Sequence, residues 1–438
     1  MNPRPYRTGI LLLCLLALAL VIRVKAADWV ERLAPPGGRF IFGDSDSYWQ
    51  LGLALSAGED FSIPRMDVIL GSIDRRVFRT PGYPLLLAGM FFVAGRDVPV
   101  VCARYMSAVL GALAVAAVYW LALRLFDGPT ALVAAAATAI YPGAIASSVF
   151  VLSEVPFCPL LVMQLVAQVA AWQAERRVPS GAWSFAAGVL AGAATLMRPS
   201  WLLFVPFAIV CGIAFSRSRP KQLACGICML VGLVIVMAPW WVRNDRVTGH
   251  FVPTSLQVGA SLYDGLNPDA WGGSDMSFVD QRADHEYFML SQAGVPSWEM
   301  EYELDRGLRQ AALAWAREHP ARVLQLAAIK FGRLWNIWPN EPQFRSWPVR
   351  LAVFFTYVPI MVLTVCGAWT FRHRGWPCVL CWLPAVYLTL LHMVFVSSIR
   401  YREPAMLPLI VLAAGVAVSW WRTRFVENKE VRDSRATH

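Results

Sequence analysis

Residues 9–22 read GILLLCLLALALVI, an uninterrupted apolar run that follows Arg4 and Arg7. Such a run behind basic residues is typical of a signal peptide, cut here near residues 24–27, or of a retained first membrane helix. We favour the retained helix with a cytoplasmic N-terminus, because the rest of the chain carries similar apolar runs. This interpretation decides the fold, since it sets which loops lie on which side of the membrane.

The composition of the 438-residue chain also indicates a membrane protein. Hydrophobic residues make up 57% and charged residues only 16%, too little charge to cover the surface of a soluble domain of this size. Further apolar runs with the character of membrane spans occupy residues 100–122, 130–148, 156–173, 182–197, 201–215, 222–240, 350–371, 377–396 and 404–421. We therefore expect an all-α polytopic membrane protein with about ten transmembrane helices.

Basic residues cluster in alternate loops, as the positive-inside rule requires when the N-terminus is cytoplasmic. They are Arg124, Arg176, Arg177, Arg217, Arg219, Lys221, Arg372, Arg374, Arg422, Arg424 and Lys429. The net charge of +10 thus fits a membrane topology, and no nucleic-acid-binding motif accompanies it. We expect both termini in the cytoplasm and two long loops outside, residues 24–99 and 241–349.

This topology divides the chain into an N-terminal membrane module, a second outer loop, C-terminal transmembrane helices and a cytoplasmic tail, which occupy residues 1–240, 241–349, 350–421 and 422–438. The apolar stretch 83–94 is too short to span, so we interpret it as an interfacial or re-entrant helix. No expected span carries Asp, Glu, Lys or Arg near its middle, where ion-coupled transporters usually need them. The sequence therefore places the function at the outer surface.

The nine cysteines indicate neither a disulfide framework nor a metal centre, because all of them lie in or beside apolar runs. Cys225 with Cys228 and Cys378 with Cys381 form two Cys-x-x-Cys pairs that could suggest a zinc site. Each pair lies within an apolar run, where cysteine behaves as a small hydrophobic residue. We expect no metal site and no cofactor, and leave a divalent-metal requirement open.

The first outer loop carries two acidic residues, Asp44 and Asp46, just before Tyr48. Asp44 and Tyr48 are four residues apart and would share one face of a helix, and Leu51 and Leu55 continue that spacing. Such a helix would lie along the membrane surface. Asp44 or Asp46 could instead simply cap its N-terminus.

Candidate anion-binding residues lie on the same outer face. Arg79 begins the segment RTPGYP, residues 79–84, where its guanidinium could bind a phosphate or merely contact lipid headgroups. Glu154 lies at an outer junction between spans, where a carboxylate is costly unless it is solvated, paired or functional. Further polar candidates on this face are Arg104, Arg198, Arg243, Asn244, Arg400, Tyr401 and Arg402. Several cations facing few acids predict a pocket for an anionic head group.

Six short motifs follow one another along the chain. They are Asp-x-x-x-Tyr at 44–48, Arg-x-Pro-x-Tyr-Pro at 79–84, Leu-Ser-Glu at 152–154, Arg-Pro at 198–199, Pro-Trp-x-x-Arg-Asn at 239–244 and Arg-Tyr-Arg-x-Pro at 400–404. This order resembles the GT-C glycosyltransferases that use polyprenyl-phosphate sugars, above all the protein O-mannosyltransferases of glycosyltransferase family 39 type and the lipid A aminoarabinose transferases. The likeness extends over residues 10–421 and implies a GT-C fold.

The resemblance also implies roles for particular residues. Asp44 matches the aspartate that acts as catalytic base in the family, although Asp46 is close enough to compete for that role. Arg79 matches the residue that contacts the donor phosphate, and Glu154 would orient the acceptor or share the work of the base. Loop 241–349 resembles the acceptor-side region. The remaining motif residues are expected to bind substrate: Tyr48, Tyr83, Arg198, Arg243, Asn244, Arg400, Tyr401 and Arg402.

We therefore expect a glycosyltransferase that moves a sugar from a polyprenyl-phosphate donor to a lipid, glycan or protein acceptor. The reaction would take place at the outer face of the cytoplasmic membrane in a single displacement. A carboxylate would take the proton of the acceptor, and arginines would stabilise the charge on the departing phosphate. The alternatives are a flippase for lipid-linked sugars and a ligase that moves whole glycan chains from a lipid diphosphate.

Overall fold

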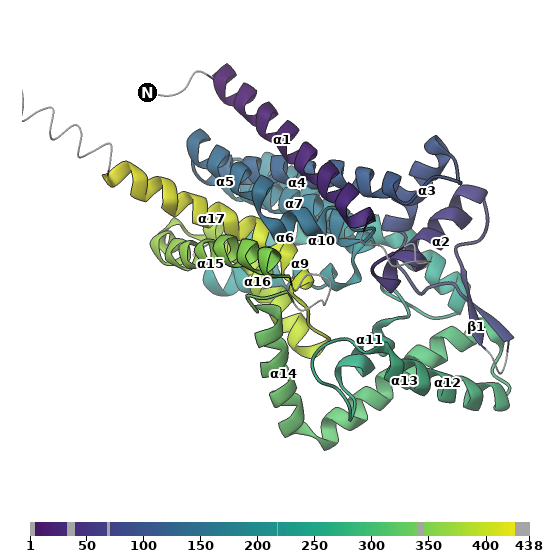
Figure 1. Cartoon of the computed structure of the whole chain (residues 1–438). Coiled ribbons are helices and arrows are strands. Elements are labelled where there is room, and N and C mark those ends of the chain that lie inside the picture. The colour runs from purple at the N-terminus through teal and green to yellow at the C-terminus, as the bar shows by residue number, and fades with distance from the viewer. Residues whose placement is uncertain (1–4, 33–39, 68–70, 217, 340–345, 425–438) are drawn as a thin grey trace, which may run out of the picture.

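The computed structural model describes residues 5–32, 40–67, 71–216, 218–339 and 346–424. In these residues a bundle of long helices carries a smaller group of helices and one β-hairpin (Figure 1). The expected all-α fold is confirmed, with this two-stranded hairpin as a small addition.

Within the described residues, eight helices are long and apolar enough to cross a membrane, which makes the chain an integral multi-pass membrane protein. They are α1 (Pro5–Glu31), α4 (Val101–Leu125), α7 (Glu154–Gln173), α8 (Arg177–Met197), α10 (Arg219–Thr248), α15 (Trp347–Thr370), α16 (Trp376–Val394) and α17 (Glu403–Arg422). Each corresponds to one of the expected spans.

The two remaining expected spans are shorter than predicted because prolines interrupt them. The run 130–148 divides into α5 (Gly128–Ile140) and α6 (Pro142–Ser147). Pro142 disfavours a helical conformation at the residue before it, and the backbone between the two helices is extended. The run 201–215 begins at the last residue of the 3-10 turn η1 (Pro199–Trp201), and its helical part is α9 (Phe204–Phe215).

Helix α1 continues past its apolar run because Arg23 finds acceptors inside the bundle. Its Nη1 donates to the carbonyl oxygens of Ala19 and Ala139 at 3.2 Å each, and Nη2 donates to that of Thr138 at 3.3 Å. Thr138 and Ala139 belong to the last turn of α5, whose carbonyls lack helical partners. A buried charge therefore lies in α1 just past the expected apolar run 9–22, and the helix ends at Glu31, later than the start of the expected outer loop at residue 24.

The first outer loop folds into α2 (Gly43–Ala57), β1 (Ile63–Asp67), β2 (Gly71–Arg75) and α3 (Gly82–Ala94). The strands pair antiparallel, with Ile63 opposite Arg75. Helix α3 is apolar and only 13 residues long, as expected of a helix that does not span. The N-cap of α2 is Phe42, and no side chain caps the helix, so neither Asp44 nor Asp46 has the capping role.

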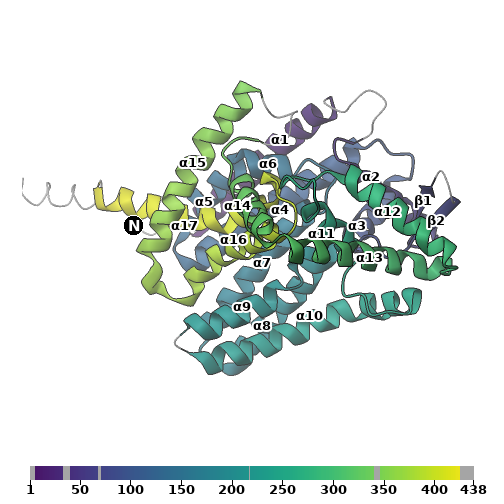
Figure 2. The same ribbon diagram turned by 90° about the horizontal axis from the view of Figure 1, so that it is seen from below.

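The second outer loop forms four helices, α11 (Val258–Gly265), α12 (Met276–Gln292), α13 (Ser297–Glu318) and α14 (Pro320–Leu334). In Figures 1 and 2, α2, the hairpin, α12 and α13 lie to the right, while the start of α1 and the end of α17 lie to the left. Both expected outer loops thus contribute to one side of the bundle, away from both ends of the described chain.

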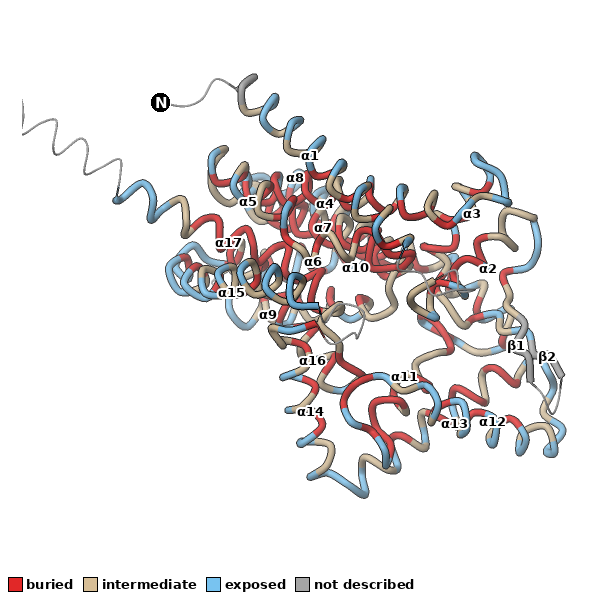
Figure 3. The backbone as a smooth tube through the Cα atoms, viewed as in Figure 1, coloured by how far each residue is buried: buried red, intermediate tan, exposed pale blue. Residues whose placement is uncertain are grey.

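The centre of the bundle is formed by α4, α7 and α17, whose inner segments are buried, while α1 and α15 expose their outward faces (Figure 3). Every residue from Glu403 to Gly415 of α17 is buried. This part of α17 is therefore enclosed by other helices and does not face lipid. The buried start of α17 fixes the position of the segment just before it, which includes Arg400.

Helices α8 and α10 pack closely because glycines face the partner backbone. A Cβ added at Gly188 would lie 2.0 Å from the carbonyl oxygen of Met229, and one at Gly232 would lie 2.4 Å from that of Phe185. Small residues at such positions let membrane helices approach one another. The packing of α8 on α10 therefore depends on the absence of a side chain at these sites.

We expect Gly188→Ala to destabilise the protein by about 1–3 kcal/mol, because the added methyl group forces the two helices apart. The measurement is the thermal midpoint of the purified chain in detergent. Gly181→Ala on the same helix is the matched control, since its Cβ would meet only the Sγ of Cys228 at 3.9 Å. Equal midpoints for the two variants would contradict this account of the packing.

Candidate functional site

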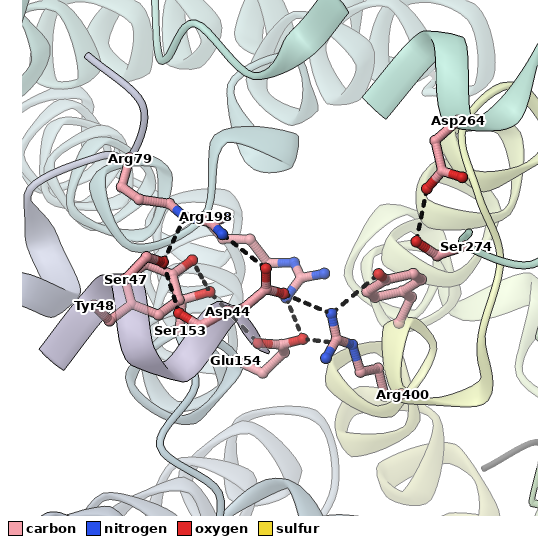
Figure 4. A network of polar contacts seen from close by, with 11 residues as sticks. Asp44, Ser47, Tyr48, Arg79, Ser153, Glu154, Arg198, Asp264, Ser274 and Arg400 are labelled. Atoms are coloured by element: carbon pink, nitrogen blue, oxygen red, sulfur yellow. Dashed lines mark hydrogen bonds and ion pairs between the residues drawn. The ribbon is translucent and has the colours of Figure 1, made fainter. Parts of the chain in front are cut away.

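Asp44 lies in the first turn of α2, and its carboxylate is held between arginines from two distant segments. Nη2 of Arg79 donates to Oδ1 at 2.7 Å, and Nη2 of Arg400 donates to Oδ2 at 3.1 Å (Figure 4). The side chain of Asp44 is 35% exposed, whereas those of Arg79 and Arg400 are 12% and 23% exposed. The carboxylate is therefore fixed by ion pairs and still partly accessible to solvent.

The two arginines determine the protonation state of Asp44. Burial alone would raise the pKa of this carboxyl group, but the positive charges of Arg79 and Arg400 outweigh burial and hold the pKa well below its usual range. An opposite charge at hydrogen-bond distance favours the ionised form. Asp44 is consequently a carboxylate at neutral pH, and a weaker base while both arginines bind it than it would be without them.

A second carboxylate, Glu154, lies next to this pair at the start of α7. Its Oε1 is 2.7 Å from Nη1 of Arg198 and 3.3 Å from Nε of Arg400, and its side chain is only 6% exposed. The positive end of the helix dipole favours a negative charge in the first turn of a helix. Because Arg400 contacts both Asp44 and Glu154, it joins the two carboxylates into one cluster.

The arginines reach this cluster because their segments end or begin helices there. Arg198 follows α8 in an extended conformation, since Pro199 disfavours helix at the preceding residue. Arg400 lies in the 3-10 turn η4 (Ile399–Tyr401), just before α17. The end of α8 and the start of α17 thus bring cations from distant parts of the sequence to one side of the bundle.

Polar side chains behind the carboxylates complete the network (Figure 4). Nε of Arg79 donates to Oγ of Ser47 at 3.0 Å. The Tyr48 hydroxyl donates to Oγ of Ser153 at 3.3 Å, and Oγ of Ser153 donates to Oε2 of Glu154 at 3.4 Å. Asp44 and Tyr48 therefore both belong to the cluster, as their spacing predicts. Ser153 is part of the Leu-Ser-Glu motif, whereas Ser47 carries no signal in the sequence.

Two tyrosines from the motifs pack against these groups. Tyr83 is fully buried, and its ring packs edge-on against that of Tyr48 with centroids 5.3 Å apart. The hydroxyl of Tyr401 accepts a hydrogen bond from Nη2 of Arg400 at 3.1 Å, and the guanidinium of Arg198 lies over its ring. Tyr401 thus belongs to the cluster, whereas Tyr83 contacts it through the ring of Tyr48.

The sequence also assigns Asp46, Arg243, Asn244 and Arg402 to the site, but none of these four residues makes an ion pair with the cluster. Asp46 is exposed. Arg243 donates from Nη2 to the carbonyl oxygen of Phe61 at 3.2 Å, and Asn244 donates from Nδ2 to that of Val252 at 3.0 Å. These two side chains fix the backbone of the outer loops.

Arg402 is the fourth of these residues, and it is buried. Its Nη1 donates to the carbonyl oxygens of Leu334 and Asn336 at 3.0 and 2.6 Å, and its Nε lies 3.6 Å from Oε1 of Glu403. These contacts connect the start of α17 to the end of α14. Arg402 therefore anchors backbone, whereas Arg400, two residues earlier, faces the carboxylates.

Among the described residues, no group of three or more His, Cys, Asp or Glu side chains is placed to hold a metal ion. The cysteines of the two Cys-x-x-Cys pairs are free thiols, and three of them, Cys225, Cys378 and Cys381, are buried. Both carboxylates of the cluster have arginine partners. The cluster thus presents guanidinium groups, which bind phosphate through paired hydrogen bonds.

Comparison with known proteins gives one family match. Residues 79–242 match the family model described as dolichyl-phosphate-mannose-protein mannosyltransferase. The matched region extends from the segment of Arg79 to α10 and includes Glu154 and Arg198. No curated protein matches the chain.

Several solved structures share the fold. An oligosaccharyltransferase from Archaeoglobus fulgidus, tethered with an acceptor peptide, has a TM-score of 0.58 at 15% identity, over 96% of this chain and 50% of that one. The oligosaccharyltransferase AglB from the same organism, in complex with an inhibitory peptide and a dolichol-phosphate, has a TM-score of 0.56 at 15% identity, over 97% and 52%. ArnT from Cupriavidus metallidurans, bound to undecaprenyl phosphate, has a TM-score of only 0.43 at 16% identity, over 93% and 77%.

The chain spans about half the length of the archaeal structures, and at this identity their likeness concerns the fold. That fold extends over nearly all of this chain, and the family match covers its central helices. Residues 79–242 thus resemble the mannosyltransferase family, and nearly the whole chain shares the fold of the archaeal oligosaccharyltransferases.

Proposed function

We propose that this protein transfers a sugar from a polyprenyl-phosphate donor to an acceptor at the outer surface of the cytoplasmic membrane, with Asp44 as the base. The observation that carries the proposal is the position of Asp44, which is accessible and held between Arg79 and Arg400. One carboxylate next to cationic groups is the arrangement that a displacement at a sugar phosphate needs. The family description names a polyprenyl-phosphate sugar, and one archaeal structure of the same fold holds a dolichol-phosphate, which is the lipid-phosphate part of such a donor.

The proposed reaction is a single displacement at the anomeric carbon of the sugar. A hydroxyl or amine of the acceptor attacks this carbon, and its proton passes to the carboxylate of Asp44. The bond between the anomeric carbon and the phosphate oxygen breaks, and its electron pair stays on the phosphate. Arg79 and Arg400 stabilise the negative charge that develops there.

The ion pairs in the ligand-free protein add one feature to this mechanism. Arg79 and Arg400 hold the carboxylate that is to act as base. A bound donor phosphate competes for the same guanidinium groups, and each hydrogen bond that it takes releases Asp44 from a positive charge. The pKa of Asp44 then rises towards its usual range, so the donor itself makes Asp44 a better base.

The second carboxylate has a different role in this proposal. Glu154 is nearly buried and close to Arg198 and Arg400, so it is placed to fix Arg400 and to orient the acceptor. Asp46 is exposed and outside the cluster, and we therefore assign the base to Asp44. Arg198 and Tyr401 complete the side of the cluster that contains Glu154.

The outward orientation of the site is part of the proposal. The described ends of the chain lie on one side of the bundle, and α2, the hairpin, α12 and α13 lie on the other (Figures 1 and 2). The basic loops predict that the side with both termini is cytoplasmic. A protease or membrane-impermeant thiol reagent applied to intact cells would report on this orientation directly.

The function is tested with the purified full chain in proteoliposomes, supplied with a panel of radiolabelled polyprenyl-phosphate sugars and with lipid, glycan and peptide acceptors. We expect label on one acceptor class, together with release of free polyprenyl phosphate. Protein-free liposomes serve as control. Passage of intact labelled donor across the bilayer without a new glycosidic bond would identify a flippase instead. Transfer of a whole glycan from a lipid diphosphate, but of no single sugar, would identify a ligase.

A further inference from the structure

The backbone that carries Arg79 is held by the second outer loop. On α13, Oε2 of Glu301 accepts hydrogen bonds from the backbone N–H groups of Arg76 at 2.7 Å and of Val77 at 3.1 Å. The backbone N–H of Leu256 donates to the carbonyl oxygen of Val77 at 2.8 Å. The chain just before Arg79 is therefore fixed on both its N–H and its C=O side.

Glu301 is itself buried, with 7% exposure. A buried carboxylate is costly unless it is hydrogen-bonded, and the two amide groups provide that compensation. Removing the carboxylate leaves both backbone N–H groups without their partner, so the segment loses its attachment to α13. The backbone from which the side chain of Arg79 extends would then no longer be held in place.

The backbone that leads to Arg400 is held by the same loop through Lys330 on α14. Nζ of this buried lysine donates to the carbonyl oxygens of Gly265 at 2.9 Å and of Val394 at 2.7 Å. Gly265 ends α11 and Val394 ends α16. Carbonyls at helix C-termini lack helical partners and carry partial negative charge, so one ammonium group satisfies two helix ends.

Further contacts extend this attachment towards Arg400. The backbone N–H of Ser397 donates to the carbonyl oxygen of Gly272 at 3.1 Å, and Nε of Arg333 donates to that of Ser397 at 3.4 Å. On the same side of the loop, Asp264 accepts a hydrogen bond from Ser274 (Figure 4). The chain from the end of α16 to Arg400 is thus fixed by α14 and by the segment after α11.

The two attachments are mechanically connected. Glu301 is on α13 and Lys330 is on α14, and only His319 separates these helices in the chain. Glu301 lies near the start of α13 and Lys330 near the end of α14, so they act from the two far ends of this helix pair, on segments that come from opposite ends of the sequence. The distance between the two guanidinium groups therefore depends on how α13 and α14 are arranged.

We propose that Glu301 and Lys330 are positioning residues, which set the separation of Arg79 and Arg400 and thereby the affinity of the site for the phosphate of the donor. The inference rests on the proposed function, because it assumes that these arginines bind that phosphate. It gives the second outer loop a part in donor binding, in addition to the acceptor-side role expected from the sequence.

The test measures binding of a sugar-free polyprenyl monophosphate to the purified full chain in detergent. We expect Glu301→Met and Lys330→Met each to raise Kd about tenfold, because misplaced groups lose productive geometry. Glu301→Gln keeps a carbonyl oxygen for the amide groups and should stay close to wild type. Thermal midpoints are measured in parallel, so that Kd refers to folded protein.

Matched controls come from the same two helices. Asp305→Asn changes a buried carboxylate one turn after Glu301, which accepts instead from the backbone N–H of Gly259 at 2.6 Å. Gln325→Met changes an exposed side chain of α14 that accepts a hydrogen bond from Nη1 of Arg322 at 2.8 Å. Neither control is expected to change Kd, because neither side chain hydrogen-bonds the segments that lead to Arg79 or Arg400.

The outcomes separate this inference from the proposed function. If wild type binds the lipid and Arg79→Met does not, while Glu301→Met and Lys330→Met bind as wild type does, the positioning roles are wrong and the phosphate site stands. If the two methionine variants lower only the thermal midpoint, their role is structural and the inference is again overturned. If wild type itself does not bind, the proposed function fails and the inference fails with it.

Discussion

Asp44→Asn is expected to lower the turnover of sugar transfer by about 10²–10⁴-fold, because an amide cannot accept the proton of the acceptor. The substitution keeps the size of the side chain, and the amide oxygen still accepts a hydrogen bond from one arginine. Arg79 and Arg400 lose a counter-charge and remain free to bind phosphate. We therefore expect the variant to bind polyprenyl monophosphate at least as tightly as wild type, so that the loss lies in kcat.

Asp46→Asn is the matched control for this prediction. It changes an exposed carboxylate two residues away on the same helix, outside the ion pairs of the cluster. We expect it to keep wild-type turnover. An inactive Asp46→Asn beside an active Asp44→Asn would transfer the base assignment to Asp46, and full activity in both would remove the aspartate base from the mechanism.

The pH dependence of the reaction follows from the same ion pairs. Since the two arginines hold the pKa of Asp44 well below its usual range, the free protein keeps this carboxylate ionised at any pH above about 4. The profile of kcat/KM should therefore show no acid limb from Asp44 above that pH. The ion pairs also raise the free energy of unfolding. This contribution is fully present above the pKa of Asp44 in the unfolded chain and is lost as the pH falls through its lowered pKa in the folded protein.

Arg400→Met is expected to lower kcat/KM by about 10²–10³-fold, the usual cost of losing one donor to a developing negative charge. Arg400 contacts both carboxylates, so the variant also separates Asp44 from Glu154. Each carboxylate keeps one arginine, at 2.7 Å in both cases, and we therefore expect the protein to fold. Transfer rates with the radiolabelled donor and thermal midpoints together test the prediction.

Arg402→Met is expected to destabilise the protein more than Arg400→Met does. Arg402 is 1% exposed and bonds two backbone carbonyls beside a buried glutamate. Removing one partner of a buried charged pair costs about 3–5 kcal/mol. We expect its thermal midpoint to fall clearly below that of Arg400→Met. A more severe loss of stability in Arg400→Met would mean that Arg400 is mainly structural.

The membrane spans could be predicted well, because a span needs a continuous apolar run and this is a local property of the sequence. The orientation inferred from neighbouring arginines and lysines stays a prediction. The break before Pro142 could also be predicted from the sequence, although the predicted span 130–148 includes it. Arg23 was missed because the acceptors that stabilise its charge belong to α5, more than a hundred residues away.

The site was predictable only in part, because residue type and order do not specify which side chains meet. Asp44 and Tyr48 share a helix face, which spacing predicts. Arg400 and Arg402 look alike in the sequence, yet one faces the carboxylates and the other bonds backbone. Glu301 and Lys330 lie in amphipathic helices without any motif, so only their tertiary partners distinguish them.

The charged cluster has a consequence for the energetics at the membrane surface. Arg79, Arg198 and Arg400 contribute three positive charges, and Asp44 and Glu154 contribute two negative charges, which leaves an excess of +1. A donor phosphodiester with a single negative charge makes the assembly electroneutral. After the proposed transfer, Asp44 is neutral and the phosphate monoester carries close to two negative charges. The sum is again near zero, so the proposed reaction moves charge within the cluster without creating a net charge beside the hydrocarbon.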